Sequence, residues 1–133
     1  MGTIEKGYLG SLIVEKKLVQ EGFNIYKPVL ENGKVDMIIE KNNIYLKIQI
    51  KTVQSSKNSK VVPLRKISHN MGEYKTKTYS DNDIEYFVGV DTVTEDIYMI
   101  PIKFSQTYAS AISINTLFKA GYVNNFDLKE ILK

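Results

Sequence analysis

The sequence predicts an α/β protein in which a helix precedes a set of strands. Apolar residues recur at helical spacing between Thr3 and Gln20, and Gly22 follows as a terminating residue. Residues 23–29 and 35–51 alternate apolar and polar side chains, as half-buried strands do. Two apolar runs, 84–90 and 97–102, predict a second pair of strands joined by a turn. The order is therefore one helix, three strands in a meander, and further strands.

Length and composition indicate one globular domain over residues 1–133. Hydrophobic residues make up 43% of the chain and charged residues 25%, a balance typical of a globular protein. Without cysteine, neither a disulfide framework nor a thiolate metal site is possible. The sequence shows no apolar signal core and no run near the roughly 18 apolar residues of a membrane span. We therefore expect an intracellular, cytoplasmic protein without a membrane partner.

The first helix is expected to begin at Thr3, whose hydroxyl is suited to capping. Glu5 then lies in the first turn, where the helix dipole favours an anion. Gly7 and Gly10 weaken the first half of this helix. They either permit the close approach of another backbone or mark a later helix start.

Residues 35–51 predict a hairpin whose turn is Asn42-Asn43, because Asn tolerates the left-handed backbone of a tight turn. Residues whose numbers sum to 85 then face each other, so Asp36 lies opposite Gln49, with Lys51 further along the same face. The other face is entirely apolar and belongs to the core; its members are Val35, Met37, Ile39, Leu46, Ile48 and Ile50.

The pattern is less regular in the second half of the chain. Apolar residues between 61 and 67 suggest one strand interrupted at Pro63, and residues 68–72 read as a loop. Residues 74–79 alternate weakly. Two short helices are expected near the end, over 114–120 and 127–132.

Basic residues concentrate in the middle of the chain. Between Lys47 and Lys77 eight basic residues stand against the single acid Glu73, a net charge of +7. Since the whole chain carries +3, the remainder carries −4. Such a strip is expected of a protein that binds a polyanion, although a solvated lysine-rich loop is an equally good interpretation of the charge alone.

The polar face of the hairpin has the groups that metal-assisted phosphodiester hydrolysis requires. Hard divalent cations prefer carboxylate and carbonyl oxygens, which Asp36, the Gln49 amide and the Ile50 backbone can supply. The Lys51 ammonium could stabilise developing negative charge. The alternative is an ordinary solvated strand face, on which Asp, Gln and Lys are common.

Several segments resemble the PD-(D/E)XK nuclease superfamily, and in particular its group I intron-associated (homing) endonuclease branch, where the second acid is often Gln. The segments are Lys6-Gly7, Gly22-Phe23, Asp36-Met37-Ile38-Ile39, Ile48-Gln49-Ile50-Lys51-Thr52, Asp83-Ile84-Glu85-Tyr86-Phe87 and Ile97-Tyr98-Met99-Ile100-Pro101. Archaeal Holliday-junction resolvases are similar through the same first half. The resemblance implies a restriction-endonuclease-like core, a mixed central β-sheet flanked by helices.

The resemblance also implies a function and the residues that perform it. The family cleaves DNA with Mg²⁺, for which Mn²⁺ can substitute, and the homing branch assembles as homo-oligomers, dimers or tetramers. Asp36 would be a metal ligand, Gln49 would occupy the second acidic position, and Lys51 would be the catalytic lysine. Double-stranded DNA would be the partner.

The first helix departs from the family pattern. The family usually places a Glu four residues after the helix glycine, where this chain has Ser11. Glu15 lies one turn further on, so that its side chain shares the same helix face and could replace the missing acid. A helix that has lost its catalytic acid is the alternative.

Three hypotheses therefore remain open. The first is a metal-dependent DNA endonuclease, of homing or restriction-like type, with Asp36, Gln49, Lys51 and Glu15 in the site. The second is a catalytically inactive DNA-binding protein on the same fold, and the third is a junction resolvase. The expected phosphate contacts are Lys57, Lys60, Arg65 and Lys66, followed by Lys75 and Lys77.

Overall fold

A five-stranded mixed sheet forms the centre of the computed structural model, which describes residues 1–30, 33–64, 66–70, 73–77 and 83–127. The strand order is β1-β2-β3-β8-β9, and all neighbours are antiparallel except β3 and β8. The predicted α/β class with a mixed central sheet is confirmed. The strands are β1 Asn24–Tyr26, β2 Met37–Lys41, β3 Ile44–Thr52, β8 Tyr86–Val90 and β9 Ile97–Pro101.

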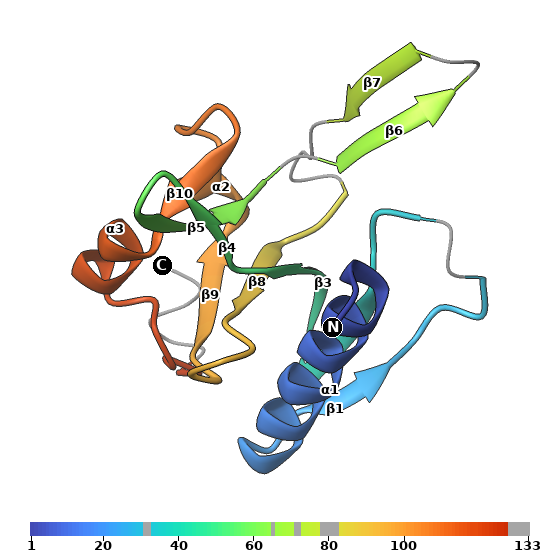
Figure 1. Ribbon diagram of the computed structural model, residues 1–133. Coiled ribbons are helices and arrows are strands. Elements are labelled where there is room, and N and C mark those ends of the chain that lie inside the picture. Colours follow the sequence, from blue (N-terminus) through green and yellow to red (C-terminus); the bar gives the residue numbers. More distant parts are fainter. Residues whose placement is uncertain (31–32, 65, 71–72, 78–82, 128–133) are drawn as a thin grey trace.

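Two smaller sheets accompany the central one (Figure 1). β10-β5-β4 packs near the β8–β9 end, whereas the β6–β7 ribbon projects away from the other elements. The smaller strands are β4 Gln54–Ser56, β5 Ser59–Pro63, β6 Lys66–Asn70, β7 Glu73–Lys77 and β10 Ala111–Ser113, and the helices are α1 Thr3–Gln20, α2 Ile102–Ser105 and α3 Ile114–Ala120. No helix in the described part of the chain has the length and apolarity needed to span a membrane.

Helix α1 packs closely on one face of the central sheet because Gly10 faces it. A Cβ atom at Gly10 would lie 2.8 Å from Thr52 Cγ2 on β3 and 3.0 Å from Val90 Cγ1 on β8. Of the two interpretations of the helix glycines, close approach is therefore correct for Gly10. The helix begins at Thr3, but Gly2 is the N-cap, and Glu5 accepts a hydrogen bond from the Gly2 N–H instead of Thr3 providing the cap.

The core lies on both faces of the central sheet. The first cluster, between α1 and the sheet, consists of Val14, Leu18, Phe23, Met37, Ile39, Leu46, Ile48, Tyr86, Val88, Val90, Ile97, Met99 and Phe126. The second cluster joins the opposite face to the small sheet and α3, and consists of Val53, Val62, Leu64, Ile84, Phe87, Tyr98, Ile100, Ile102, Ile112 and Leu117. A small sheet thus covers part of the central sheet, in addition to the flanking helices that were expected.

The central hairpin has the predicted register. Asn42 and Asn43 adopt φ values of 54° and 66°, and pairing runs from Lys41↔Ile44 to Met37↔Ile48 with numbers that sum to 85. Two left-handed residues twist the turn in the same sense as the strands, which is why Asn-Asn closes this hairpin tightly.

Predictions for the second half were less accurate. Residues 68–70 belong to strand β6 and not to a loop, and β4, α2 and β10 were not predicted. Helix α3 spans the predicted residues 114–120. The predicted loop residues 71–72 and almost all of the predicted helix 127–132 lie outside the described residues.

An ion pair attaches the β4–β5 hairpin to the turn after β8. Lys60 Nζ donates to Asp91 Oδ2 at 3.1 Å, and the Asp91 side chain is 6% exposed. The other carboxylate oxygen accepts hydrogen bonds from the N–H groups of Val93 and Thr94. Burial by itself raises the pKa of the Asp91 carboxyl, but these backbone hydrogen bonds and Lys60 outweigh it, so that the pKa is lowered.

Substituting alanine for Gly7 and for Gly10 should change the stability of the fold in opposite directions. Gly10→Ala should destabilise the fold by about 1–3 kcal/mol, because the methyl group overlaps Thr52 and Val90. Gly7→Ala should stabilise it by about 0.5–1 kcal/mol, because nothing lies within 4 Å and alanine is the better helix former. Urea unfolding of both variants measures the difference, and equal effects would contradict the close contact.

Asp91→Asn should lower the free energy of unfolding by about 1–3 kcal/mol at neutral pH, since a charge-assisted network is lost. The lowered pKa means that the carboxylate's contribution is present above its ordinary value of 3.8 and is lost as the pH falls through the folded-state value. The gap between the parent and the variant should therefore narrow in acid. Glu95→Gln, at an exposed position of the turn after β8, is the control and should have a much smaller effect on stability.

Candidate active site

The regular pairing of β2 and β3 ends in a β-bulge at Asp36. Met37 pairs with Ile48, and the Asp36 N–H also donates to the Ile48 carbonyl at 2.9 Å. Two residues of one strand thus face one residue of the other, which bends the strand and redirects its side chains. The predicted pair Asp36–Gln49 is therefore not formed. Val35 is displaced as well, and packs against the second cluster instead of the face that holds Met37.

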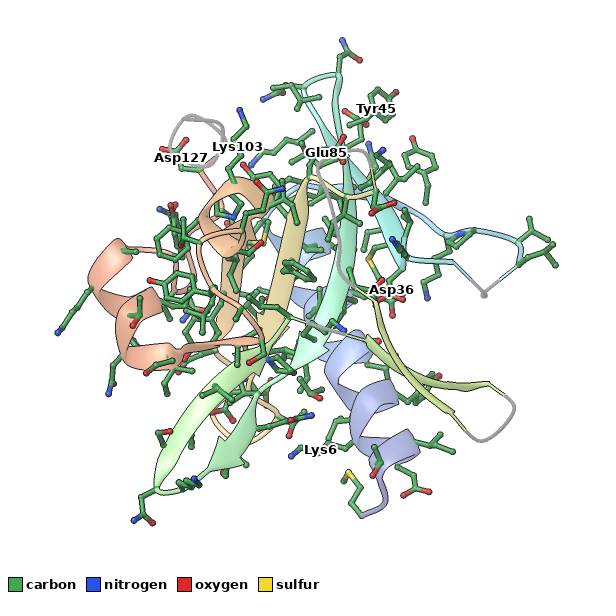
Figure 2. All side chains as sticks on the ribbon, turned by 90° about the horizontal axis from the view of Figure 1, so that it is seen from above. Lys6, Asp36, Tyr45, Glu85, Lys103 and Asp127 are labelled. Atoms are coloured by element: carbon green, nitrogen blue, oxygen red, sulfur yellow. The ribbon has the colours of Figure 1, made fainter. Side chains whose placement is uncertain are left out.

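The bulge carries the Asp36 carboxylate to the edge of β3. Asp36 Oδ2 accepts a hydrogen bond from the Ile50 N–H at 2.8 Å, and Figure 2 shows Asp36 beside β3 on the side away from β8. In an extended strand the N–H and C=O of one residue point to the same side. The Ile50 carbonyl therefore also faces the edge where Asp36 lies.

Gln49 and Lys51 flank Ile50 in the sequence and point to the second face of the sheet. Alternation places them opposite in direction to Ile48, a member of the first cluster, and to Thr52, which contacts the helix glycine. The Gln49 Oε1 atom is buried and has no hydrogen-bond partner among the described residues. Lys51 is half-buried. The carboxylate, the amide and the ammonium are thus gathered around the Ile50 peptide, although from two directions.

One stripe of α1 faces Asp36 across a cavity of about 320 Å³. Its helix residues are spaced by three and four positions, so that they share one face of α1: Tyr8, Ser11, Leu12 and Glu15. The opposite wall includes Asp36, Met37 and Ile50. Glu15 therefore points into the same cavity as Asp36, which is the arrangement required if it replaces an acid at Ser11.

The cavity also contains a cation that the sequence did not indicate. Lys27, directly after β1, lines the cavity and forms an ion pair with Glu15. In the sequence Lys27 is one of the polar positions of the alternating segment 23–29, and no motif distinguishes it. Only the folded chain shows that it approaches the helix.

The oxygen atoms present suit a hard divalent cation. Asp36 supplies a carboxylate, and Gln49 supplies an amide oxygen that is desolvated without a donor, an arrangement that costs free energy unless something positive contacts it. The Ile50 carbonyl faces the same edge as Asp36. In the described part of the chain no three His, Cys, Asp or Glu residues form a metal-binding group, so any ion would depend on neutral oxygens as well.

The predicted phosphate-contact residues within the described part of the chain lie on two hairpins, β4–β5 and β6–β7. Lys57 is exposed at the tip of the β4–β5 hairpin, with φ of 45° in its turn. Lys60, on β5, forms the ion pair with Asp91, so its charge already has a structural partner. Lys66 on β6 pairs in register with Lys77 on β7, and Lys75 pairs with Ser68. Arg65 lies outside the described residues.

Comparison with known proteins agrees with this geometry. A family model described as PD-(D/E)XK endonuclease matches residues 1–121. Among solved structures, the bacterial homing endonuclease I-Ssp6803I superposes with a TM-score of 0.77 at 24% identity, over 85% of this chain and 78% of that chain. At this identity the likeness concerns the fold. A search of the curated proteins found no match.

We expect the buried Gln49 oxygen, which has no hydrogen-bond partner among the described residues, to lower the stability of the protein. Gln49→Met fills nearly the same volume without an unpaired oxygen, so the metal-free protein should unfold with a free energy about 1 kcal/mol higher. Gln54→Met, at an exposed position on β4, should change stability little. Thermal unfolding in a chelator measures both, and a destabilised Gln49→Met would show that the amide makes a favourable contact.

Proposed function

Because the chain belongs to the PD-(D/E)XK endonuclease family, we propose that it is a metal-dependent endonuclease that hydrolyses phosphodiester bonds in double-stranded DNA. The observation that carries the proposal is the group of oxygens around the Ile50 peptide. A carboxylate at the strand edge and a buried amide oxygen without a donor stand on either side of it. These features support a cation site, because on a solvated strand face the amide oxygen would be hydrogen-bonded to water.

Asp36, Gln49 and the Ile50 carbonyl would hold the ion, for which Mg²⁺ is proposed and Mn²⁺ is a substitute. When bound, such an ion stabilises the charge of the phosphate and makes a bound water more acidic. Lys51 would place its ammonium against the scissile phosphate, where it stabilises the negative charge that develops during the reaction. Glu15, on the opposite wall of the cavity, would provide the second carboxylate.

The β6–β7 ribbon is the proposed DNA-binding element. The major groove admits a two-stranded ribbon, and this one projects from the body of the protein (Figure 1). Lys66 and Lys77 occupy paired positions of its ladder, and Lys75 pairs with Ser68, so that the ribbon carries three of the proposed phosphate contacts. Lys57, on a separate hairpin tip, is proposed as a further phosphate contact.

Cleavage of both strands calls for two active sites. Each chain has one group of this kind in its described residues, so we propose a homo-oligomer, a dimer or a tetramer, in which two copies address the two strands. Sedimentation analysis with and without duplex DNA tests this assembly separately from catalysis.

The second candidate is a catalytically silent DNA-binding protein. It is favoured by Ser11 at the position of the usual helix acid and by the ion pair that already occupies Glu15. Against it stands the orientation of Glu15, which lines the cavity together with Asp36. A junction resolvase is distinguished by adding a four-way junction to the substrates tested.

Plasmid nicking with Mg²⁺ or Mn²⁺ tests the leading proposal. The parent protein should nick supercoiled DNA, and Lys51→Ala should reduce the rate by about 10²–10³-fold, because one charge-stabilising group is removed. Lys47→Ala is the matched control: it removes a lysine from the same face of the same strand, four residues away from Lys51, and should retain most of the activity.

Ser11→Glu separates the two candidates. If the parent is inactive and this variant gains metal-dependent nicking, the site has been silenced by one lost carboxylate. If the parent and Ser11→Glu are both inactive while salt-dependent DNA binding persists, the endonuclease proposal is wrong and the protein binds DNA without cutting it.

A further inference from the structure

The Glu15–Lys27 ion pair places a positive charge where a metal site is proposed. Among the described residues, the charged side chains that line the cavity are Glu15, Asp36 and Lys27, so that these two carboxylates carry −2 and the lysine brings their sum to −1. Lys27 therefore offsets half of the negative charge that Glu15 and Asp36 would offer to a cation. As long as Lys27 contacts Glu15, that carboxylate is engaged by another cation.

The two members of the pair differ in freedom. The Glu15 side chain is only 20% exposed, held on a helix that packs closely on the sheet, whereas the Lys27 side chain is 55% exposed and belongs to the segment after an edge strand. Such a half-exposed ion pair is weakly stabilising, because water and salt screen it. Lys27 is thus the partner that can move, and its long flexible stem allows the ammonium to reach other anions near the cavity mouth.

We propose that Lys27 exchanges partners when DNA binds, leaving Glu15 for a backbone phosphate so that the Glu15 carboxylate becomes available to the divalent cation. This inference rests on the proposed nuclease function and gives Lys27 a positioning role in it. Lys27 neutralises the helix acid in the free protein and becomes a phosphate contact in the complex. The catalytic metal site is then completed only when substrate is present.

The exchange couples the two ligands thermodynamically. If a phosphate takes Lys27 away from Glu15, DNA must tighten cation binding, and the cation must tighten DNA binding by the same factor. The ion pair has a separate role when no ligand is present. It compensates the negative charge of Glu15, which would otherwise stand alone in a partly buried wall of the cavity.

Calorimetric titration of the full chain with Ca²⁺ tests the exchange without any dependence on turnover. In the absence of DNA, Lys27→Met should bind Ca²⁺ about fivefold more tightly than the parent, since Glu15 no longer has a competing cation. Lys16→Met is the matched control: it removes one positive charge from the helix position next to Glu15, outside this cavity, and should change the affinity less than twofold.

A duplex added to the same titration measures the coupling. A short duplex of arbitrary sequence should tighten Ca²⁺ binding about fivefold in the parent and in Lys16→Met, but little in Lys27→Met. Glu15→Gln should abolish the effect of Lys27→Met when the two are combined, because the lysine acts through that carboxylate. Circular dichroism of each variant confirms that the fold is retained.

Two results would overturn these ideas separately. Equal Ca²⁺ affinities for Lys27→Met and Lys16→Met, with binding present in both, refute the exchange and leave the proposed nuclease intact. Absence of Ca²⁺ and Mn²⁺ binding in every variant, with or without duplex, removes the metal site and therefore the proposed function together with the exchange.

Discussion

The site depends on the place where β2 stops pairing regularly with β3. As long as the hairpin register continues, side chains alternate and each polar residue faces another across the ladder. At Asp36 the regular ladder ends, because its N–H shares the Ile48 carbonyl with Met37, and its carboxylate then takes the Ile50 N–H that a continuing strand would have bonded. The Asp36 carboxylate thus replaces the backbone carbonyl that would otherwise accept the hydrogen bond of the Ile50 N–H. The carboxylate is held at a strand edge by a hydrogen bond to a rigid element, where it can face both the helix and the end of the sheet.

The close packing of α1 determines what lies opposite that carboxylate. Gly10 allows the helix to approach Thr52 and Val90 without an intervening side chain, and the position of the helix stripe that lines the cavity follows from this contact. A helix held further away would also move Ser11 and Glu15 away from the wall of the cavity that holds Asp36. The Gly10 contact therefore determines both the packing of the first cluster and the geometry of the cavity. A substitution at Gly10 would affect stability and the site together.

Two polar groups of the candidate site lack full compensation. The Gln49 oxygen, on the second face of the sheet, is buried without a donor among the described residues, and Glu15, in the cavity, is paired with a lysine that is itself half-exposed. Elsewhere the chain satisfies a buried charge fully: Asp91 receives two backbone hydrogen bonds and a lysine, and anchors a hairpin. The contrast distinguishes a carboxylate with a structural role from the less fully compensated groups that we propose as ligands of a cation.

The sequence alone determined the elements whose patterns are local. The Asn42-Asn43 turn, the register up to Met37 and helix 114–120 were predictable, because turn chemistry and periodicity act over a few residues. The motif around Asp36, Gln49 and Lys51 likewise indicated the family, which the match over residues 1–121 confirms. Three features could be seen only in the tertiary structure. They are the bulge at Asp36, the packing of the β10-β5-β4 sheet on the second face of the central sheet, and the ion pair between Lys27 and Glu15. Each of these depends on how different elements pack in the folded chain, and such contacts leave no pattern in the local sequence.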